Sequence, residues 1–175
     1  MLISRTFIEG LIVIEPRLFK DPRGYFFESY NREAFLSYDL DYHFVQDNQS
    51  YSTCGVLRGL HFQRGEHAQS KLVRVLQGEI LDVVVDLRPD SNTYLKHFSI
   101  RLSDSNKLQL LVPKGFAHGF VVLSDTAEVM YKCDNYYHPA SEGGLMYDDP
   151  KLNIDWILPS EQLIINQKDL QYQYL

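Results

Sequence analysis

The chain has 175 residues, of which 45% are hydrophobic and 13% aromatic, so it has the composition of a folded domain and not of a disordered chain. Its 17 basic and 23 acidic side chains give a formal net charge of −6, which argues against the basic field that a nucleic-acid or anionic-membrane surface requires. Two cysteines are too few for a zinc cluster or a secreted disulfide framework. The sequence shows neither a signal-peptide pattern nor a run of the ~20 apolar residues that cross a bilayer. We therefore expect one cytoplasmic domain over residues 1–175.

Short runs of β-branched and aromatic residues, separated by turn residues, follow one another along most of the chain. We predict strands over residues 11–15, 24–30, 42–46, 56–63, 72–76, 79–87, 94–102, 107–112, 116–123 and 127–133. Residues 31–36 predict one short helix capped by Asn31, and the tail over residues 160–170 predicts a further turn or two. Gln77 and Gly78 form a turn signal, which predicts a hairpin between the strands on either side.

The order of these elements favours an all-β fold. About ten strands follow at regular spacing, without a long linker, an internal repeat or a low-complexity segment. The helices that a parallel sheet needs for its crossover connections are missing. The pattern therefore predicts an antiparallel sandwich or a small barrel.

Two strands contain polar residues that a simple core strand would not choose. Period-two alternation over residues 56–63 places His61 and Gln63 on one face with Gly59, where the small residue leaves room for a ligand. His118 begins another apolar, glycine-flanked strand. A hydrogen-bonded structural role explains any single one of these histidines equally well, because buried polar groups are usually satisfied in this way.

The spacing of these residues resembles the two motifs of the cupins, a jelly-roll family. The matching segments are Gly55-x5-His61-x-Gln63, Lys71-x6-Gly78 and Pro113-x-Gly115-x2-His118. In metal-binding cupins the first motif supplies two histidines and a glutamate and the second a further histidine; this chain keeps His61 and His118 but has Gln63 and Lys71 at the other two ligand positions. A lysine cation repels a divalent ion and can polarise a carbonyl in its place, so the resemblance implies a cupin without a metal or other cofactor and disfavours a metal-dependent dioxygenase.

Six segments in order are similar to the signatures of the dTDP-4-dehydrorhamnose 3,5-epimerases: residues 19–28, 46–50, 56–63, 71–74, 112–120 and 131–132. The similarity extends from about residue 7 to residue 169. It implies an antiparallel jelly-roll or cupin sandwich with short N-terminal and C-terminal helical segments. It also implies an epimerase that inverts C3 and C5 of a dTDP-4-keto-6-deoxy-hexose, in deoxysugar biosynthesis of the dTDP-L-rhamnose type.

The same resemblance implies the catalytic residues. Epimerisation beside a ketone needs a base for the α-proton, a group that holds the enolate, and an acid on the opposite face. A histidine suits the base at neutral pH, because its unperturbed pKa is about 6.5. The family pattern makes His61 the base, Asp169 its carboxylate partner, Tyr131 the acid, and Lys71 the group facing the keto oxygen.

Further residues match positions that surround the substrate in the family. Arg58, His118 and Lys168 are implied to contact the sugar or the diphosphate, and an arginine fork suits phosphate oxygens. Near the nucleotide, the resemblance implies that Gln46 and Asn48 contact the base or ribose and that Tyr136 stacks, although Tyr136 could equally pack against its aromatic neighbours. An early strand with Arg23, Phe26 and Glu28 is of the kind that crosses to a neighbouring subunit, so we expect a homodimer with shared sites.

Several alternatives remain open at this stage. An epimerase acting at C3 alone or at C5 alone, or a ketoisomerase of a related nucleotide sugar, would need nearly the same residues. A non-enzymatic sugar-binding jelly roll is a third reading, against which the joint presence of His61 and Asp169 argues. The segment that delivers Asp169 departs from the family pattern at Asn153, Ile157 and Asn166.

Overall fold

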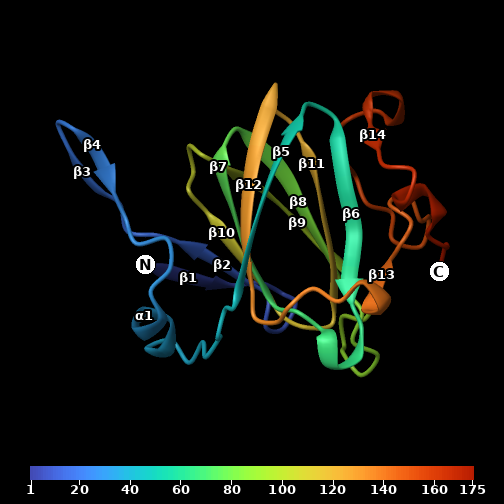
Figure 1. Cartoon of the computed structure of the whole chain (residues 1–175), viewed down its shortest axis with the longest axis horizontal. Helices are drawn as coiled ribbons and strands as arrows, with labels where there is room; N and C mark the ends of the chain where they lie inside the picture. The colour runs from blue at the N-terminus through green and yellow to red at the C-terminus, as the bar shows by residue number, and fades with distance from the viewer.

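The computed structural model describes all residues, 1–175, and is built mainly of β-strands (Figure 1). The strands are β1 (Leu2–Arg5), β2 (Ile12–Glu15), β3 (Phe19–Asp21), β4 (Gly24–Phe26), β5 (Gln46–Thr53), β6 (Val56–Gln63), β7 (Lys71–Gln77), β8 (Glu79–Asp86), β9 (His97–Ser103), β10 (Gln109–Val112), β11 (Phe116–Val122), β12 (Thr126–Cys133), β13 (Glu142–Gly144) and β14 (Ile164–Ile165). The one α-helix is α1 (Arg32–Leu36), and short 3₁₀ turns cover Gly65–His67, Pro139–Ser141, Ser160–Gln162 and Asp169–Gln171. None of the helices has the length and apolar character needed to span a bilayer.

Two large sheets form the sandwich. The first has the strand order β1-β2-β10-β7-β12-β5, and the second has the order β13-β6-β11-β8-β9, with β14 added beside β6. All pairs are antiparallel except β14 with β6. The predicted antiparallel sandwich is therefore confirmed. The hairpin of β3 and β4 pairs with neither sheet and projects from the body (Figure 1).

Strand alternation divides the apolar side chains among three clusters. The largest lies between the two sheets and includes Val73, Val84 and Phe120. A second covers the outer face of β6, β11 and β8 with side chains from the C-terminal segment, among them Trp156. The third packs Phe35 of α1 against the outer face of the first sheet. Both sheets are therefore covered by apolar side chains on their outer faces as well, and at one end the space between them holds a polar cavity.

The predicted helix over residues 31–36 is confirmed, because α1 begins after Asn31, whose side chain accepts a hydrogen bond from the Ala34 N–H at 3.2 Å. The tail likewise contains two short turns within residues 160–171. The hairpin at Gln77 and Gly78 is wrong: β7 pairs with β10 and β12, whereas β8 pairs with β9 and β11. Gly78 instead carries the chain from one sheet to the other.

Other boundaries also differ from the sequence prediction. The strand predicted over residues 42–46 is wrong, because the strand there is β5, which begins at Gln46 and ends at Thr53. The strand predicted over 24–30 ends at Phe26. Four short strands were not predicted, namely β1, β3, β13 and β14.

Candidate active site

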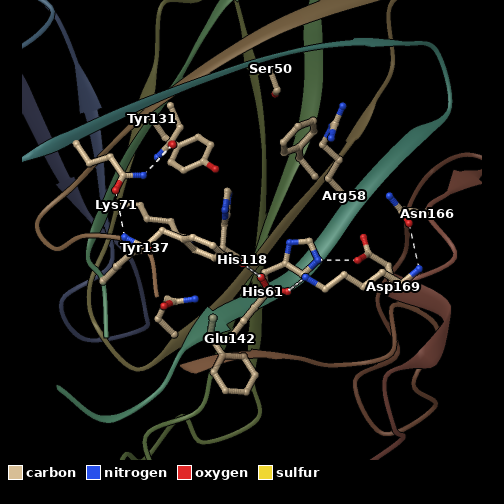
Figure 2. Close-up of a pocket in the computed structure, with 17 residues that line it drawn as sticks. Ser50, Arg58, His61, Lys71, His118, Tyr131, Tyr137, Glu142, Asn166 and Asp169 are labelled. Carbon is tan, nitrogen blue, oxygen red and sulfur yellow. Dashed lines mark hydrogen bonds and ion pairs between the residues drawn. The ribbon is translucent and has the colours of Figure 1, made fainter. Parts of the chain in front are cut away.

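A cavity of about 440 Å³ opens at one end of the sandwich, between the two sheets (Figure 2). The first sheet contributes side chains from β5, β7 and β12, and the second contributes side chains from β6 and β11. The C-terminal segment closes one side with Asn166, Lys168 and Asp169. The volume lies in the range of roughly 300–1,000 Å³ that small-molecule sites occupy.

The local shape of β6 brings Arg58 and His61 to the same side of the strand. Gly59 has φ +129°, and the register between β6 and β11 shifts at this point. A Cβ on Gly59 would lie 2.5 Å from the Gly119 Cα, so the close approach of the two strands requires glycine. As a result Leu57 and Leu60 both face the outer cluster, while Arg58 and His61 both line the cavity. The uninterrupted alternation predicted for this strand is therefore wrong at Gly59.

His61 is paired with a carboxylate from the far end of the chain. Its Nε2 lies 2.8 Å from the Asp169 Oδ1, and the Asp169 Oδ2 accepts a hydrogen bond from the Gly59 N–H at 3.3 Å. The Asp169 side chain is only 6% exposed, whereas that of His61 is 35% exposed and so remains open to the cavity. An ionised Asp169 accepts the Nε2 proton, which leaves the lone pair of His61 on Nδ1.

A second histidine–carboxylate pair lies beside the first. His118 is directly opposite His61 in the pairing of β11 with β6, and its Nε2 lies 2.7 Å from the Asp82 Oδ1. Both side chains are buried, and the Asp82 Oδ2 has no hydrogen-bond partner. Sequence reasoning missed Asp82, although a single acid within the apolar run of β8 was a usable signal.

Lys71 and Tyr131 come from the first sheet and face the histidines across the cavity (Figure 2). Burial lowers the pKa of the Lys71 ammonium, while Cys133 and Asp82 oppose that shift. Burial raises the pKa of the Tyr131 phenol above its ordinary value, so the phenol stays protonated at neutral pH. The Lys71 Nζ lies 5.7 Å from the centre of the Tyr131 ring.

Glu142 at the edge of the cavity collects three donors, and sequence reasoning missed it. It accepts hydrogen bonds from the Tyr137 hydroxyl at 2.6 Å and the Tyr172 hydroxyl at 2.9 Å, and it forms an ion pair with Lys168. Burial would raise the pKa of Glu142, but the hydrogen bonds from Lys168, Tyr137 and Tyr172 hold it at about 2. The same ion pair raises the pKa of Lys168.

The remaining cavity residues form a polar rim. The Arg58 Nε donates to the Ser52 Oγ at 3.0 Å, and this contact anchors the guanidinium at the rim. The Gln46 Nε2 donates to the Asn48 Oδ1 at 2.9 Å. Residues of the rim that were not predicted as contacts include Ser50, Gln69, Tyr137 and Asn166.

Nine of the thirteen residues predicted for the site therefore line one cavity: Gln46, Asn48, Arg58, His61, Lys71, His118, Tyr131, Lys168 and Asp169. The other four do not. Arg23 and Phe26 lie on the projecting hairpin, where Arg23 pairs with Asp21, and Tyr136 is 65% exposed outside the cavity. Glu28 follows the hairpin and accepts a hydrogen bond from Asn31.

The donor set does not suit the metal that many cupins bind. No group of three or more histidine, cysteine or carboxylate side chains is arranged to hold an ion. The Nε2 atoms of His61 and His118 are each committed to a carboxylate, and Lys71 adds a cation to the same cavity.

Comparisons with known proteins agree with this geometry. The family model described as dTDP-4-dehydrorhamnose 3,5-epimerase matches residues 5–175. A relative of that name from Escherichia coli (strain K12) is 53% identical over 172 residues, which cover 97% of this chain and 91% of the relative.

Solved structures give the same result. The crystal structure of dTDP-4-dehydrorhamnose 3,5-epimerase from Elizabethkingia anophelis NUHP1 has a TM-score of 0.96 and 50% identity, covering 99% of this chain and 96% of that one. The crystal structure of dTDP-6-deoxy-D-glucose-3,5-epimerase from Legionella pneumophila Philadelphia 1, in complex with dTDP-4-keto-L-rhamnose, has a TM-score of 0.94 and 46% identity, covering 99% of this chain and 92% of that one.

Proposed function

The chain belongs to the dTDP-4-dehydrorhamnose 3,5-epimerase family, and from this we propose that it inverts C3 and C5 of a dTDP-4-keto-6-deoxy-hexose. It is an isomerase whose substrate is a nucleotide sugar. The observation that carries the proposal is the cavity itself: a histidine on one sheet, paired with a carboxylate from the C-terminal segment, faces a lysine and a protonated tyrosine on the other sheet. A sugar ring held between the sheets has one face toward each of these groups.

The first step is removal of the proton next to the ketone. The Nδ1 of His61 takes this proton, because Nε2–H is held by Asp169. The imidazolium that forms is stabilised by the buried carboxylate, as in a catalytic triad. Asp169 itself keeps its charge and fixes the orientation of the ring.

The negative charge of the enolate develops on the keto oxygen. Lys71 supplies a cation for it from the facing sheet, in the role that a metal ion plays in other enzymes. Burial leaves the Lys71 ammonium poorly solvated, which lowers its pKa, and the cation is therefore strongly stabilised when an anion forms beside it. Asp82 also lies near Lys71 and favours its charged form.

Reprotonation from the other face completes the inversion. Tyr131 donates its phenolic proton to the carbon, the enolate returns to the ketone, and the phenolate recovers a proton from solvent. His61 loses its extra proton to solvent as well. The same pair acts at C3 and at C5 when the ring presents each carbon in turn.

Charged groups at the rim suit the diphosphate. Arg58 and Lys168 are both exposed enough to meet phosphate oxygens while lining the cavity, and an arginine can bind two oxygens at once. His118 lies deeper, beside the position of the sugar. Gln46 and Asn48 on β5 line the same cavity, and we propose that they contact the ribose or the base.

The proposal for the nucleotide end of the site includes a second subunit. Arg23, in the turn between β3 and β4, and Phe26, on β4, project from the body, and Phe26 is 67% exposed. We propose that this hairpin, with Glu28, completes the site of a partner subunit in a two-fold dimer, and that Tyr136 stacks on the base. Sedimentation at micromolar concentration is expected to show a dimer; a fully active 20.4 kDa monomer would refute the proposal.

The proposed function is tested by NMR of dTDP-4-keto-6-deoxyglucose in heavy water with the protein added. We expect deuterium to enter at C3 and C5 and the inverted sugar to form. Exchange at one carbon alone would identify a mono-epimerase, and movement of the keto group would identify a ketoisomerase. Binding of the nucleotide sugar without any exchange would support the sugar-binding jelly roll instead.

A further inference from the structure

The catalytic carboxylate is carried by the C-terminal segment, residues 166–175, and not by either large sheet. The base, His61, lies on β6, and Asp169 can orient it only if the segment that carries Asp169 is itself fixed. Residues on either side of Asp169 are tied to a single carboxylate: Lys168 forms an ion pair with Glu142, and the Tyr172 hydroxyl donates to the same Glu142 oxygen. Glu142 therefore spans the turn that contains Asp169.

Tyr172 also contacts the base directly. The centre of its ring lies 5.8 Å from the centre of the His61 imidazole, with an angle of 67° between the two planes. The ring lies against Gly144, where an added Cβ would be 2.3 Å from two ring carbons. Gly144 is in turn the residue opposite His61 in the pairing of β13 with β6. The absence of a side chain at Gly144 thus provides the space in which Tyr172 lies beside His61.

We propose that Tyr172 is a positioning residue for the His61–Asp169 pair. The imidazole is bounded by Asp169 at Nε2 and by the Tyr172 ring at its side, so that Nδ1 points consistently toward the sugar. Small displacements of a catalytic group are costly, and a shift of about 1 Å can lower a rate about 100-fold. This inference rests on the proposed function and adds to it a residue that touches neither the reacting carbons nor the keto oxygen.

The test compares three variants by rate of deuterium entry at C3 and C5. Tyr172→Leu removes the ring and the hydroxyl, and we expect kcat to fall about tenfold while KM changes less than about twofold. Tyr172→Phe keeps the ring and is expected to lose only about threefold. Tyr174→Phe is the matched control, since Tyr174 belongs to the same segment but its hydroxyl donates to Asp148 outside the cavity, and the kcat of this variant should equal that of the wild type.

A double-mutant cycle separates positioning from a loss of folding. Gly144→Ala should displace the Tyr172 ring and lower kcat on its own, but it should cost little more in a chain that already has Tyr172→Leu. Additive losses, or a kcat unchanged in Tyr172→Leu, would overturn the inference. If Tyr172→Leu does not fold, as judged by circular dichroism, then Tyr172→Met, which also lacks the ring, takes its place in the cycle with Gly144→Ala. Failure of the proposed function looks different, because the wild type itself would then show no exchange.

Discussion

Replacing Asp169 with asparagine keeps the shape of the site but removes the charge that faces His61. Two unit charges about 4 Å apart at an effective dielectric constant of about 20 interact by about 4 kcal/mol. Because the His61 side chain is 35% exposed, we discount this for solvent screening to about 2–3 kcal/mol. Without the carboxylate charge, the state in which His61 is an imidazolium loses this stabilisation, and kcat falls by between about 30-fold and about 150-fold.

The hydrogen bond to Gly59 adds a second effect. Asp169 Oδ2 accepts from the Gly59 N–H, so the amide oxygen of an asparagine will occupy that position and its NH2 group will face the His61 Nε2. The imidazole must then carry its proton on Nδ1, which is the wrong tautomer for a base at that atom. We therefore expect the total fall in kcat to exceed about 100-fold.

The assay is the initial rate of deuterium entry into the sugar at saturating substrate, with thermal denaturation to confirm that the variant is folded. Asp148→Asn is the control, because this carboxylate also accepts a hydrogen bond from the C-terminal segment but is exposed. Its rate should match that of the wild type. A folded Asp169→Asn variant that keeps more than about a fifth of the wild-type kcat would refute the role of Asp169 as the partner of the base.

Three further results are expected from the structure. Lys71→Met should lower kcat by about 10²–10³-fold, because it removes the cation that faces the enolate oxygen. It should also raise the melting temperature, because it removes a charge that is costly to bury. A lower melting temperature would contradict this expectation for stability. Gly59→Ala should cost about 3 kcal/mol of unfolding free energy in denaturant titrations, because its Cβ meets backbone at 2.5 Å, whereas Gly24→Ala, at nearly the same φ but in open space, should cost less. The pKa of Glu142 is held at about 2, below its ordinary 4.5, so the stability that the ionised carboxylate contributes is present above about pH 4.5 and is lost as the pH falls toward 2. The difference in unfolding free energy between the wild type and Glu142→Gln should therefore shrink over that interval. A difference that stays constant would argue against the ion pair.

The features that local sequence controls were predictable. Asn31 caps α1 because its side chain and the helix that follows lie within four residues. Most strands of the sandwich were found because their apolar residues alternate between two covered faces. Asn153, one of the departures from the family pattern, adopts φ 48°, a left-handed conformation that asparagine tolerates.

The features that depend on distant partners were not predictable in the same way. β5 was missed along most of its length because its inward residues, such as Asn48 and Ser50, line a polar cavity and so give no apolar alternation. The turn at Gly78 was read as a hairpin because a glycine turn does not tell which sheet the next strand will join.

The same distinction between local sequence and distant partners applies to the residues of the site. The family resemblance indicated His61, Lys71, Tyr131 and Asp169, which the fold brings together in one cavity. Glu142 was missed because its partners Lys168 and Tyr172 lie 26 and 30 residues away along the chain. Only the folded C-terminal segment shows that these residues surround the pair at His61.

The central claim is that a base on one sheet and an acid on the other act on opposite faces of the sugar. It is tested most directly by deuterium occupancy at C3 and C5 against time for His61→Ala and Tyr131→Phe. We predict no deuterium entry in His61→Ala, because the enolate never forms, and continued exchange with loss of inversion in Tyr131→Phe, most severely at C5. Equal loss of exchange and inversion in Tyr131→Phe would contradict the claim and would make Tyr131 a packing residue.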